Sequence, residues 1–488
     1  MEHEQEQQFI EAAVRAFREQ MSGALAQMRR ADSASSFAES ERLLHSLARQ
    51  VAGSLTERIV QEICSDEERR AGAVARVRAR AAKLGITLRS EGRRTTEVRT
   101  LGGQLIRVED CYLVAAPRGG VVRTKRGAQG TGVYPTLDML GIAGRSTPAL
   151  RLQVAHAVCE ANSVESARDL LSSGGTEIDY KAALRLTYMV TEDALAARAQ
   201  AVAKTTVGND AGEFVGHRIA VAVDGGRVCV RRRVAGRPRN GGRKRFVTEW
   251  REPKVLTIYV IDAEGKRDRR FASVTDGTLG DADALFALVR YHLLRVGGHR
   301  AREVVFRGDA APWIWNRTDK LRADLGLPLE RFTEVVDWYH VVERLTELAK
   351  SRAGWSEEEQ SRWLDEQRER LVAGEVERVQ EAALSLLKGQ PSARETEEAY
   401  WLRNRDRVRY DRLLVAKLPI GSGAVESAVR RVVNLRLKGA SIVWTEEHAE
   451  GVLHLRAFAK SGRWTELEQE VLARTAWRPT ARSAANAA

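Results

Sequence analysis

Cysteine is scarce in this chain of 488 residues, and long apolar runs are absent from it. Its four cysteines lie far apart and form no C-x-x-C pair, which argues against a disulfide framework and against a cysteine zinc site. No run reaches the ~18 apolar residues that a membrane-spanning helix needs, so we expect no membrane partner. The N-terminal sequence MEHEQEQQFIEAAVRAF lacks the basic segment and apolar core of a secretory signal. These absences together predict a cytoplasmic protein with reduced thiols.

Negative charge is in the minority, because 79 Lys and Arg residues outnumber 66 Asp and Glu residues and give a net charge of +13. Such an excess favours a polyanionic partner, and nucleic acid is the expected one for a chain without a membrane anchor. The alternative is that the charge only keeps the protein soluble.

The positive charge is concentrated in one segment, RRRVAGRPRNGGRKR, at residues 231–245. Eight of its fifteen residues are basic and none is acidic. Its Gly and Pro residues predict a flexible loop that can follow a phosphate backbone. The candidate DNA-binding residues of this segment are Arg231, Arg232, Arg233, Arg237, Arg239, Arg243, Lys244 and Arg245.

The N-terminal region, residues 1–90, is predicted to be largely helical. Apolar residues from Ile10 to Met28 alternate spacings of four and three, which is typical of helices that pack within a chain. The same spacing occurs in coiled coils, so dimerisation through this region stays open. Residues 91–147 are expected to form a small β-rich domain that contains a Gly-Gly turn.

Three short helices are predicted over residues 148–205. Asn162 or Ser163 would cap the second helix, and a Gly-Gly pair would separate it from the third. This pattern is compatible with a helix-turn-helix that reads DNA, in which Lys181 and Arg185 would face the duplex. The alternative is a pair of helices that only pack against each other.

The second half of the chain alternates apolar strands with helices. IAVAVDGG, GRVCVRR and KVLTIYVID are predicted strands, and a helix, the strand EVVFRGD, a second helix and the strand FTEVVDW follow them. This order, with a long charged helical insertion before the last helix, is that of the α/β ribonuclease H fold, a mixed sheet flanked by helices. The predicted division is a catalytic domain over residues 206–345 and 413–475, a helical insertion over 346–412 and a flexible tail over 476–488.

Three acidic residues become candidate metal ligands in this arrangement. Asp224 and Asp309 end the runs VAVD and VVFRGD, and ligand sites gather at the carboxyl ends of neighbouring strands. Taken alone, Asp224 before two glycines also fits the tight turn of a β-hairpin. Glu426 would lie in the first turn of a helix capped by Ser422, where stabilising the helix dipole is the alternative role. Three carboxylates suit two Mg²⁺ or Mn²⁺ ions, which assist phosphodiester displacement.

The helix that contains Glu426 continues with a basic and polar face. Arg430, Asn434 and Lys438 follow Glu426 at intervals of four residues and would share one side of the helix. An acid followed by bases and an amide suits a face that binds metal first and DNA phosphates next. An ordinary solvated stripe would have the same pattern.

Four blocks of sequence resemble a known family. VAVDGGRV, FRGDAAPWIWN, VVDWYHVVERL and LPIGSGAVESAVRRVVNLRLKGASIVWTEEHAEGVLHLRA are similar to blocks of the DDE transposases of bacterial insertion sequences. The similarity is closest to the ISKra group, which is related to the Mutator-like transposases. The resemblance implies that Asp224, Asp309 and Glu426 form the catalytic triad and hold the metal ions. It also matches Asp337 and His340 to an Asp-x-x-His element that supports the site or the DNA.

The resemblance implies a function and its partners. We expect a transposase that cleaves DNA at the terminal inverted repeats of its element and transfers the ends into target DNA, acting as a homodimer or higher oligomer at the nucleoid. Relatives often have paired cysteines near DCYLVAAPRG, but Cys111 stands alone here, so zinc is not expected. Two alternatives stay open: a ribonuclease H-fold nuclease without strand transfer, and a domesticated DNA-binding protein without catalysis.

Overall fold

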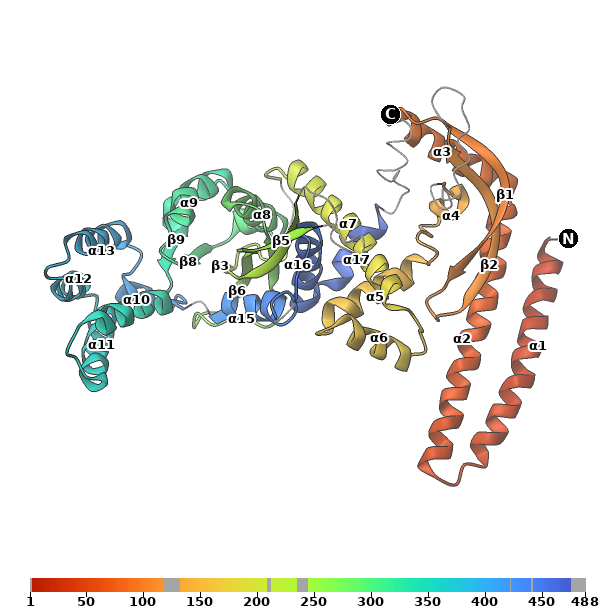
Figure 1. Ribbon diagram of the computed structural model, residues 1–488, viewed down its shortest axis with the longest axis horizontal. Helices are drawn as coiled ribbons and strands as arrows, with labels where there is room; N and C mark the ends of the chain where they lie inside the picture. The colour runs from red at the N-terminus through yellow and green to blue at the C-terminus, as the bar shows by residue number, and fades with distance from the viewer. Residues whose placement is uncertain are drawn as a thin grey trace. The chain divides into compact units, whose positions relative to one another are not determined.

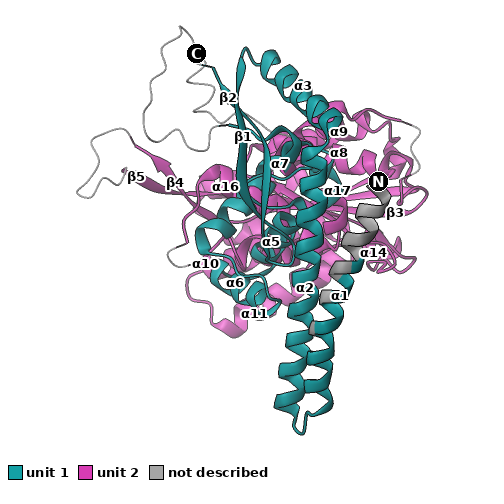
Figure 2. Cartoon of the chain, turned by 90° about the vertical axis from the view of Figure 1, so that its right-hand side faces the viewer, with its two compact units in different colours: residues 1–193, 468–488 teal, residues 194–467 magenta. Residues whose placement is uncertain are grey.

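The computed structural model describes residues 2–116, 132–208, 212–234, 245–421, 423–439 and 442–474 (Figure 1). The chain divides into two compact units (Figure 2). Unit 1 comprises residues 1–193 and 468–488, and unit 2 comprises residues 194–467. Among the described residues, no helix combines the length and the apolar character needed to cross a membrane.

Unit 1 begins with three helices, in the region predicted to be helical. They are α1 (Glu2–Arg29), α2 (Ala34–Ser65) and α3 (Glu67–Lys83), and α1 and α2 lie side by side (Figure 1). Ser33 caps α2 in a reciprocal capping box with Ser36, and Asp66 caps α3 by accepting a hydrogen bond from the amide of Arg69. Local hydrogen bonds of polar side chains therefore set where these helices begin.

A two-stranded antiparallel ribbon follows, formed by β1 (Leu88–Arg99) and β2 (Leu105–Ala115). Its apolar side packs against α2, where Val98 and Ile106 join a cluster with Cys64. The buried carboxylate of Asp110 accepts hydrogen bonds from the backbone amides at the start of α4 (Pro135–Met139). Hydrogen bonds to this buried carboxylate therefore hold the ribbon and the short helix together.

Helices α5 (Pro148–Glu160), α6 (Val164–Ser173) and α7 (Tyr180–Lys204) occupy the region in which three short helices are predicted. The sequence predicts either Asn162 or Ser163 as the cap of α6. In the structure Ser163 is the cap, and its side chain accepts a hydrogen bond from the amide of Ser166. After α6 the chain turns at Gly175, whose φ of +83° favours glycine. The third helix is not short, because α7 has 25 residues.

Unit 2 contains a five-stranded mixed sheet, so its fold is α/β. The strand order is β7-β6-β3-β8-β9. β3 pairs in parallel with β8, as predicted, and β8 pairs in parallel with β9, whereas β6 runs antiparallel to both β3 and β7. The strands are β3 (Arg218–Gly225), β6 (Lys254–Ile261), β7 (Val274–Thr278), β8 (Glu303–Gly308) and β9 (Phe332–Val336).

Helices cover both faces of this sheet because its central strands are apolar on both sides. Val221 and Val223 belong to a core cluster with residues of α8 and α9, whereas Ala222 packs with residues of α15 and α16. The helices are α8 (Ala282–Arg295), α9 (Pro312–Asp324), α15 (Gly423–Val429) and α16 (Glu446–Ser461). The remaining short elements are η1 (Gly298–Arg300), η2 (Leu329–Arg331) and α17 (Trp464–Leu472).

A helical segment lies between β9 and α15, where the sequence predicts a helical insertion. It consists of α10 (Trp338–Ser351), α11 (Glu357–Val372), α12 (Val376–Leu386), α13 (Pro391–Asn404) and α14 (Tyr410–Val415). Trp401 is buried in it and donates a 2.7 Å hydrogen bond from its indole nitrogen to Glu397. Glu397 also pairs with Arg344 at 2.7 Å, so α10 and α13 are held together by a buried polar contact.

The predicted strand GRVCVRR lies outside the main sheet. The segment GRVCVRR does not pair with β3. Its residues form β4 (Val228–Arg233), which pairs antiparallel with β5 (Phe246–Arg251) in a separate two-stranded ribbon, while β3 pairs with β6. The hairpin turn considered for Asp224 is therefore excluded. Arg231, Arg232 and Arg233 are also not in a flexible loop, because they belong to β4.

A buried polar cluster lies at the edge strand β7. The carboxylate of Asp276 is 2.9 Å from Nε2 of His292 on α8, 2.9 Å from Nδ1 of His454 on α16 and 3.1 Å from Nη1 of Arg198 on α7. Arg198 also pairs with Glu450. Burial alone would raise the pKa of Asp276, but His454 and Arg198 outweigh it and hold that pKa well below its usual value. Burial lowers the pKa of His292 to about 4. The cluster therefore ties three helices to one strand.

Candidate active site

The first two predicted ligands meet at one edge of the sheet. Asp224 lies at the end of β3 and Asp309 directly follows β8, its parallel neighbour. Both side chains are partly buried. The pKa of Asp224 is raised to about 6, chiefly by burial and to a lesser extent by the charges of Asp309 and Glu426, against a hydrogen bond from Gly225 and the charge of His340. The three predicted acids therefore act on one another electrostatically.

Backbone hydrogen bonds orient the two aspartates. The amide of Gly225 donates to Oδ1 of Asp224 at 2.7 Å, and the amide of Ala311 donates to Oδ1 of Asp309 at 2.8 Å. Before Asp309, Gly308 allows a close approach, because a Cβ there would lie 2.8 Å from Ile314. The turn after β8 is thus held by α9, which fixes the position of Asp309.

Asp337 and His340 lie beside the aspartates. Asp337 caps α10 with Oδ1 and donates its amide to the carbonyl of Gly308 at 2.9 Å, directly before Asp309. Nδ1 of His340 is 3.3 Å from Oδ1 of Asp337. The pKa of His340 is raised to about 9, mainly by this contact and also by the charges of Asp224 and Asp309, which together outweigh the opposing effect of burial. A cationic imidazole therefore offsets part of the local negative charge.

Glu426, the third predicted acid, lies on α15. Its side chain is exposed in the first turn of α15, which packs on β3 and β6. The segment before α15 is anchored, because the amide of Trp338 donates to the carbonyl of Ile420 at 2.9 Å and Arg307 donates to the carbonyl of Gly421. Ser422, the predicted cap of this helix, lies outside the described residues.

The chemistry of these side chains fits a hard divalent cation. The donors are carboxylate oxygens that repel one another, and Oδ2 of Asp337 is buried without a hydrogen-bond partner in the part of the chain that the structure describes. Across those same residues, however, no three His, Cys, Asp or Glu side chains are arranged to hold an ion together. The acids share one electrostatic field but do not form a coordination shell.

The basic face predicted after Glu426 is not continuous. α15 ends at Val429 and is followed by a π-helical turn, Arg430–Asn434, so residues four apart no longer align along one α-helical face. Lys438 lies beyond this turn. Arg430, Asn434 and Lys438 are nevertheless all exposed, so each is accessible to a ligand.

The other predicted DNA contacts are distributed over the chain. Lys181 and Arg185 are exposed one turn apart at the start of α7. Arg231, Arg232, Arg233 and Arg245 are exposed on or beside the β4–β5 ribbon. Arg237, Arg239, Arg243 and Lys244 lie outside the described residues.

Two residues near Asp224, Glu252 and Lys254, are not predicted from the sequence as part of the site. A Cβ at Gly225 would lie 2.4 Å from a carboxylate oxygen of Glu252, which places a further acid beside the site. Lys254 pairs with Gly225 across the sheet, and its ammonium lies 5.7 Å from the ring of Trp313 and 3.7 Å from Glu252. No motif marks these positions, because their proximity depends on the β3–β6 register.

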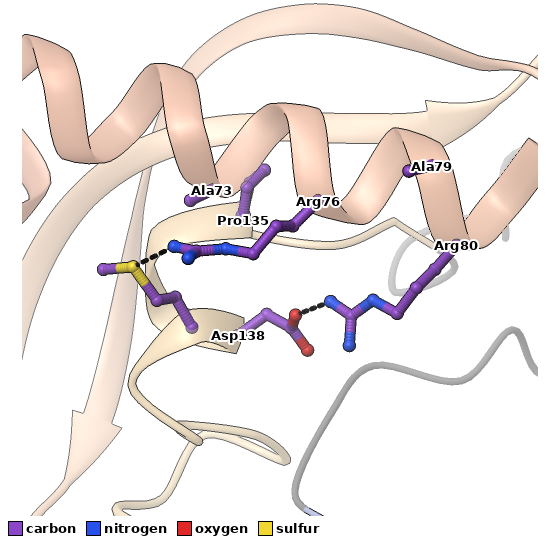
Figure 3. A pocket seen from close by; sticks show the side chains of 7 residues that line it. Ala73, Arg76, Ala79, Arg80, Pro135 and Asp138 are labelled. Carbon is purple, nitrogen blue, oxygen red and sulfur yellow. Dashed lines mark hydrogen bonds and ion pairs between the residues drawn. The ribbon is translucent and has the colours of Figure 1, made fainter.

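A separate hollow of about 480 Å³ lies in unit 1 between α3 and α4 (Figure 3). Arg80 pairs there with Asp138, and Nη2 of Arg76 is 2.7 Å from the sulfur of Met139. The one carboxylate that lines this hollow is neutralised by an arginine, so it offers no acid–base pair. The carboxylate edge in unit 2 is the stronger candidate for catalysis.

No protein-family model, curated protein or solved structure matches this chain at a significant level.

Proposed function

We propose that this chain is a DDE transposase that cleaves and joins DNA with divalent metal ions. The observation that supports this most directly is the meeting of Asp224 and Asp309 at the ends of adjacent parallel strands, within the electrostatic reach of Glu426. Such a set of hard oxygen donors is the type that two-metal phosphodiester chemistry uses.

The topology of the sheet supports the same proposal. The order β7-β6-β3-β8-β9, in which only β6 runs against the other strands, is the strand order of ribonuclease H-like folds. The helical insertion between β9 and α15 agrees with the ISKra resemblance, in which the third acid follows such an insertion. We infer a ribonuclease H-like catalytic domain.

In the proposed reaction, Asp224, Asp309 and Glu426 would hold Mg²⁺ or Mn²⁺. Bound cations would neutralise charge at the attacked phosphate and stabilise the entering and leaving oxygens. Asp337 fixes the start of α10, and His340 places a positive charge among the acids, which limits their mutual repulsion. The protein's own contribution is therefore to gather the acids and position the DNA.

The proposed DNA partners are the terminal inverted repeats of the element and the target site. In this proposal unit 1 binds the repeats, with Lys181 and Arg185 on the exposed start of α7 facing the duplex. Exposed arginines of unit 2 would hold the phosphates near the carboxylates. We further propose that a homodimer or larger assembly acts on both ends at the nucleoid.

Joining of pre-cleaved ends separates this proposal from its alternatives. We expect the wild-type protein, with Mg²⁺ or Mn²⁺, to join a duplex bearing the inverted repeat and a free 3′-hydroxyl to a supercoiled plasmid. The same duplex with a 3′-deoxy end is the matched control and should give no product, because the attacking oxygen is missing. Cleavage without joining would instead indicate a nuclease, and neither reaction would indicate a DNA-binding protein without catalysis.

A further inference from the structure

We propose that the β4–β5 ribbon binds unpaired bases of a DNA strand through one face, on which Phe246 and Trp250 stack against bases and Arg231 and Arg233 contact phosphates. This inference rests on the proposed function for the identity of the ligand as DNA. The inference adds to the proposed function a second binding surface, which would hold single-stranded DNA beside Asp224.

The chain path places the ribbon at the carboxylate edge. β3 ends at Gly225, one residue after Asp224, and β4 begins at Val228. The chain returns to the sheet at Lys254, which pairs with Gly225. Both ends of the ribbon therefore start beside Asp224, and the ribbon extends outward from unit 2 (Figure 2).

The root of the ribbon is fixed, whereas its outer part is exposed. Val228 and Val230 are buried in a cluster with Trp444. The amide of Arg231 donates to the carbonyl of Trp444 at 2.7 Å, and the amide of Trp444 donates to the carbonyl of Cys229 at 3.1 Å. A ribbon anchored in this way can present side chains without a large loss of conformational entropy on binding.

The strand register gives the two faces of the ribbon different charges. One face contains Arg232 and Arg251, and each lies 3.8 Å from Glu249 between them. The opposite face pairs Arg231 with Thr248 and Arg233 with Phe246, and Trp250 lies beside them without any acid. The arginines of this second face are therefore not neutralised by a carboxylate within the ribbon.

The aromatic side chains of the second face are exposed. Trp250 is 54% exposed and Phe246 is 53% exposed, and the guanidinium of Arg227 lies 5.4 Å from the centre of the Trp250 ring. Water-exposed aromatic rings interleaved with arginines are typical of surfaces that bind single-stranded nucleic acid. Arginine also suits phosphate through its planar, bidentate guanidinium.

The side chains favour unpaired bases over an intact duplex. A two-stranded ribbon is narrow enough to enter a major groove, where bases are recognised by hydrogen bonds to their edges. The benzyl side chain of Phe246 has no hydrogen-bonding group, and the indole of Trp250 has a single donor. Their flat faces match the faces of bases, which become available only where the strands separate.

Binding of labelled oligonucleotides to the full-length protein tests the proposal. With EDTA present, we expect Trp250→Ala to weaken binding of a fluorescein-labelled single strand by about tenfold, the loss of one stacked base. Affinity for the same sequence as a blunt duplex should change less than about threefold, because its bases stay stacked. Trp250→Phe should restore most of the single-strand affinity, since a ring is retained.

An arginine pair in one strand supplies the matched control. Arg233→Gln removes a charge from the acid-free face and should lower single-strand affinity more than Arg232→Gln, whose guanidinium already faces Glu249. The proposal would be overturned if Trp250→Ala lost equal affinity for single-stranded and duplex DNA, or if it lost no affinity for the single strand. The proposed transposase activity would stand in that case, because joining is assayed separately. Absent joining with intact single-strand binding would contradict the proposed function alone.

Discussion

Replacing Asp309 with Asn is expected to abolish metal-dependent cleavage of element ends. The change keeps the size of the side chain but removes one charged oxygen ligand, so a cation would bind and act less strongly. A loss of several kcal/mol of stabilisation at the reacting phosphate corresponds to roughly a thousandfold lower rate. Glu426→Gln should have an effect of the same order. Cleavage of a labelled inverted-repeat duplex with Mg²⁺ measures both variants.

The same variants should still bind the duplex, because the substituted side chains belong to the proposed carboxylate site and not to α7, the proposed end-binding helix. Asp319→Asn is the matched control, since this α9 aspartate is 90% exposed and pairs only weakly with Arg322 at 3.9 Å. It should cleave like the wild type. Near-normal cleavage by Asp309→Asn or by Glu426→Gln would refute the assignment of the acids.

Replacing Asp276 with Asn is expected to destabilise unit 2 by about 3–5 kcal/mol. The carboxylate is fully buried, and without it the charge of Arg198 loses a partner inside the protein. Urea unfolding followed by tryptophan fluorescence measures the change. Asp283→Asn removes an aspartate that is 77% exposed and paired with Arg317, so it should cost at most about 1 kcal/mol. Equal stability of the two variants would contradict the structural role of the cluster.

The same cluster predicts a defined acid sensitivity. The pKa of His292 is about 4 in the folded protein against an ordinary value of 6.5. Between these values the unfolded chain binds more protons, so the free energy of unfolding falls as the pH falls through this window. The pKa of Asp276 is also lowered, so its contribution is lost at still lower pH. In His292→Gln the slope between pH 6.5 and 4 should flatten, and an unchanged slope would assign the sensitivity elsewhere.

The positions of Asp224 and Asp309 could be predicted because the strands that end at them are strongly apolar. All five residues from Ile219 to Val223 are buried, a continuous run that indicates a strand covered on both faces, and the run before Asp309 has the same character. The order of strands and helices expected for a ribonuclease H fold places these two strands, β3 and β8, side by side and parallel, as they are in the structure. The approach of Asp224 to Asp309 follows from that pairing.

The missed elements are those whose sequences lack this signal. β7 has the sequence VTDGT, and its Asp276 is buried only because distant residues such as His454 and Arg198 supply partners. β5 alternates poorly because most of its side chains are exposed on both faces. The register of β5 against β4, which places Trp250 with the arginines, depends on tertiary packing around Trp444.

The charged helix face after Glu426 failed as a prediction for a related reason. The spacing of Arg430 and Asn434 is perfect for an α-helix, yet the chain widens there into a π-helical turn. Such turns are one residue longer than an α-turn and arise from packing, which spacing alone does not reveal. Val432 and Val433 are both buried in this turn, so the core and not the polar face sets the local geometry.

Titration of Mn²⁺ into the metal-free protein, followed by electron paramagnetic resonance of the free ion, tests for a metal centre at these carboxylates without needing a DNA substrate. We expect the wild-type chain to take up about two ions. The Asp224→Asn/Asp309→Asn double variant should take up none of them in the same concentration range. Equal uptake by the two proteins, or no uptake by the wild type, would contradict a metal centre built on these carboxylates.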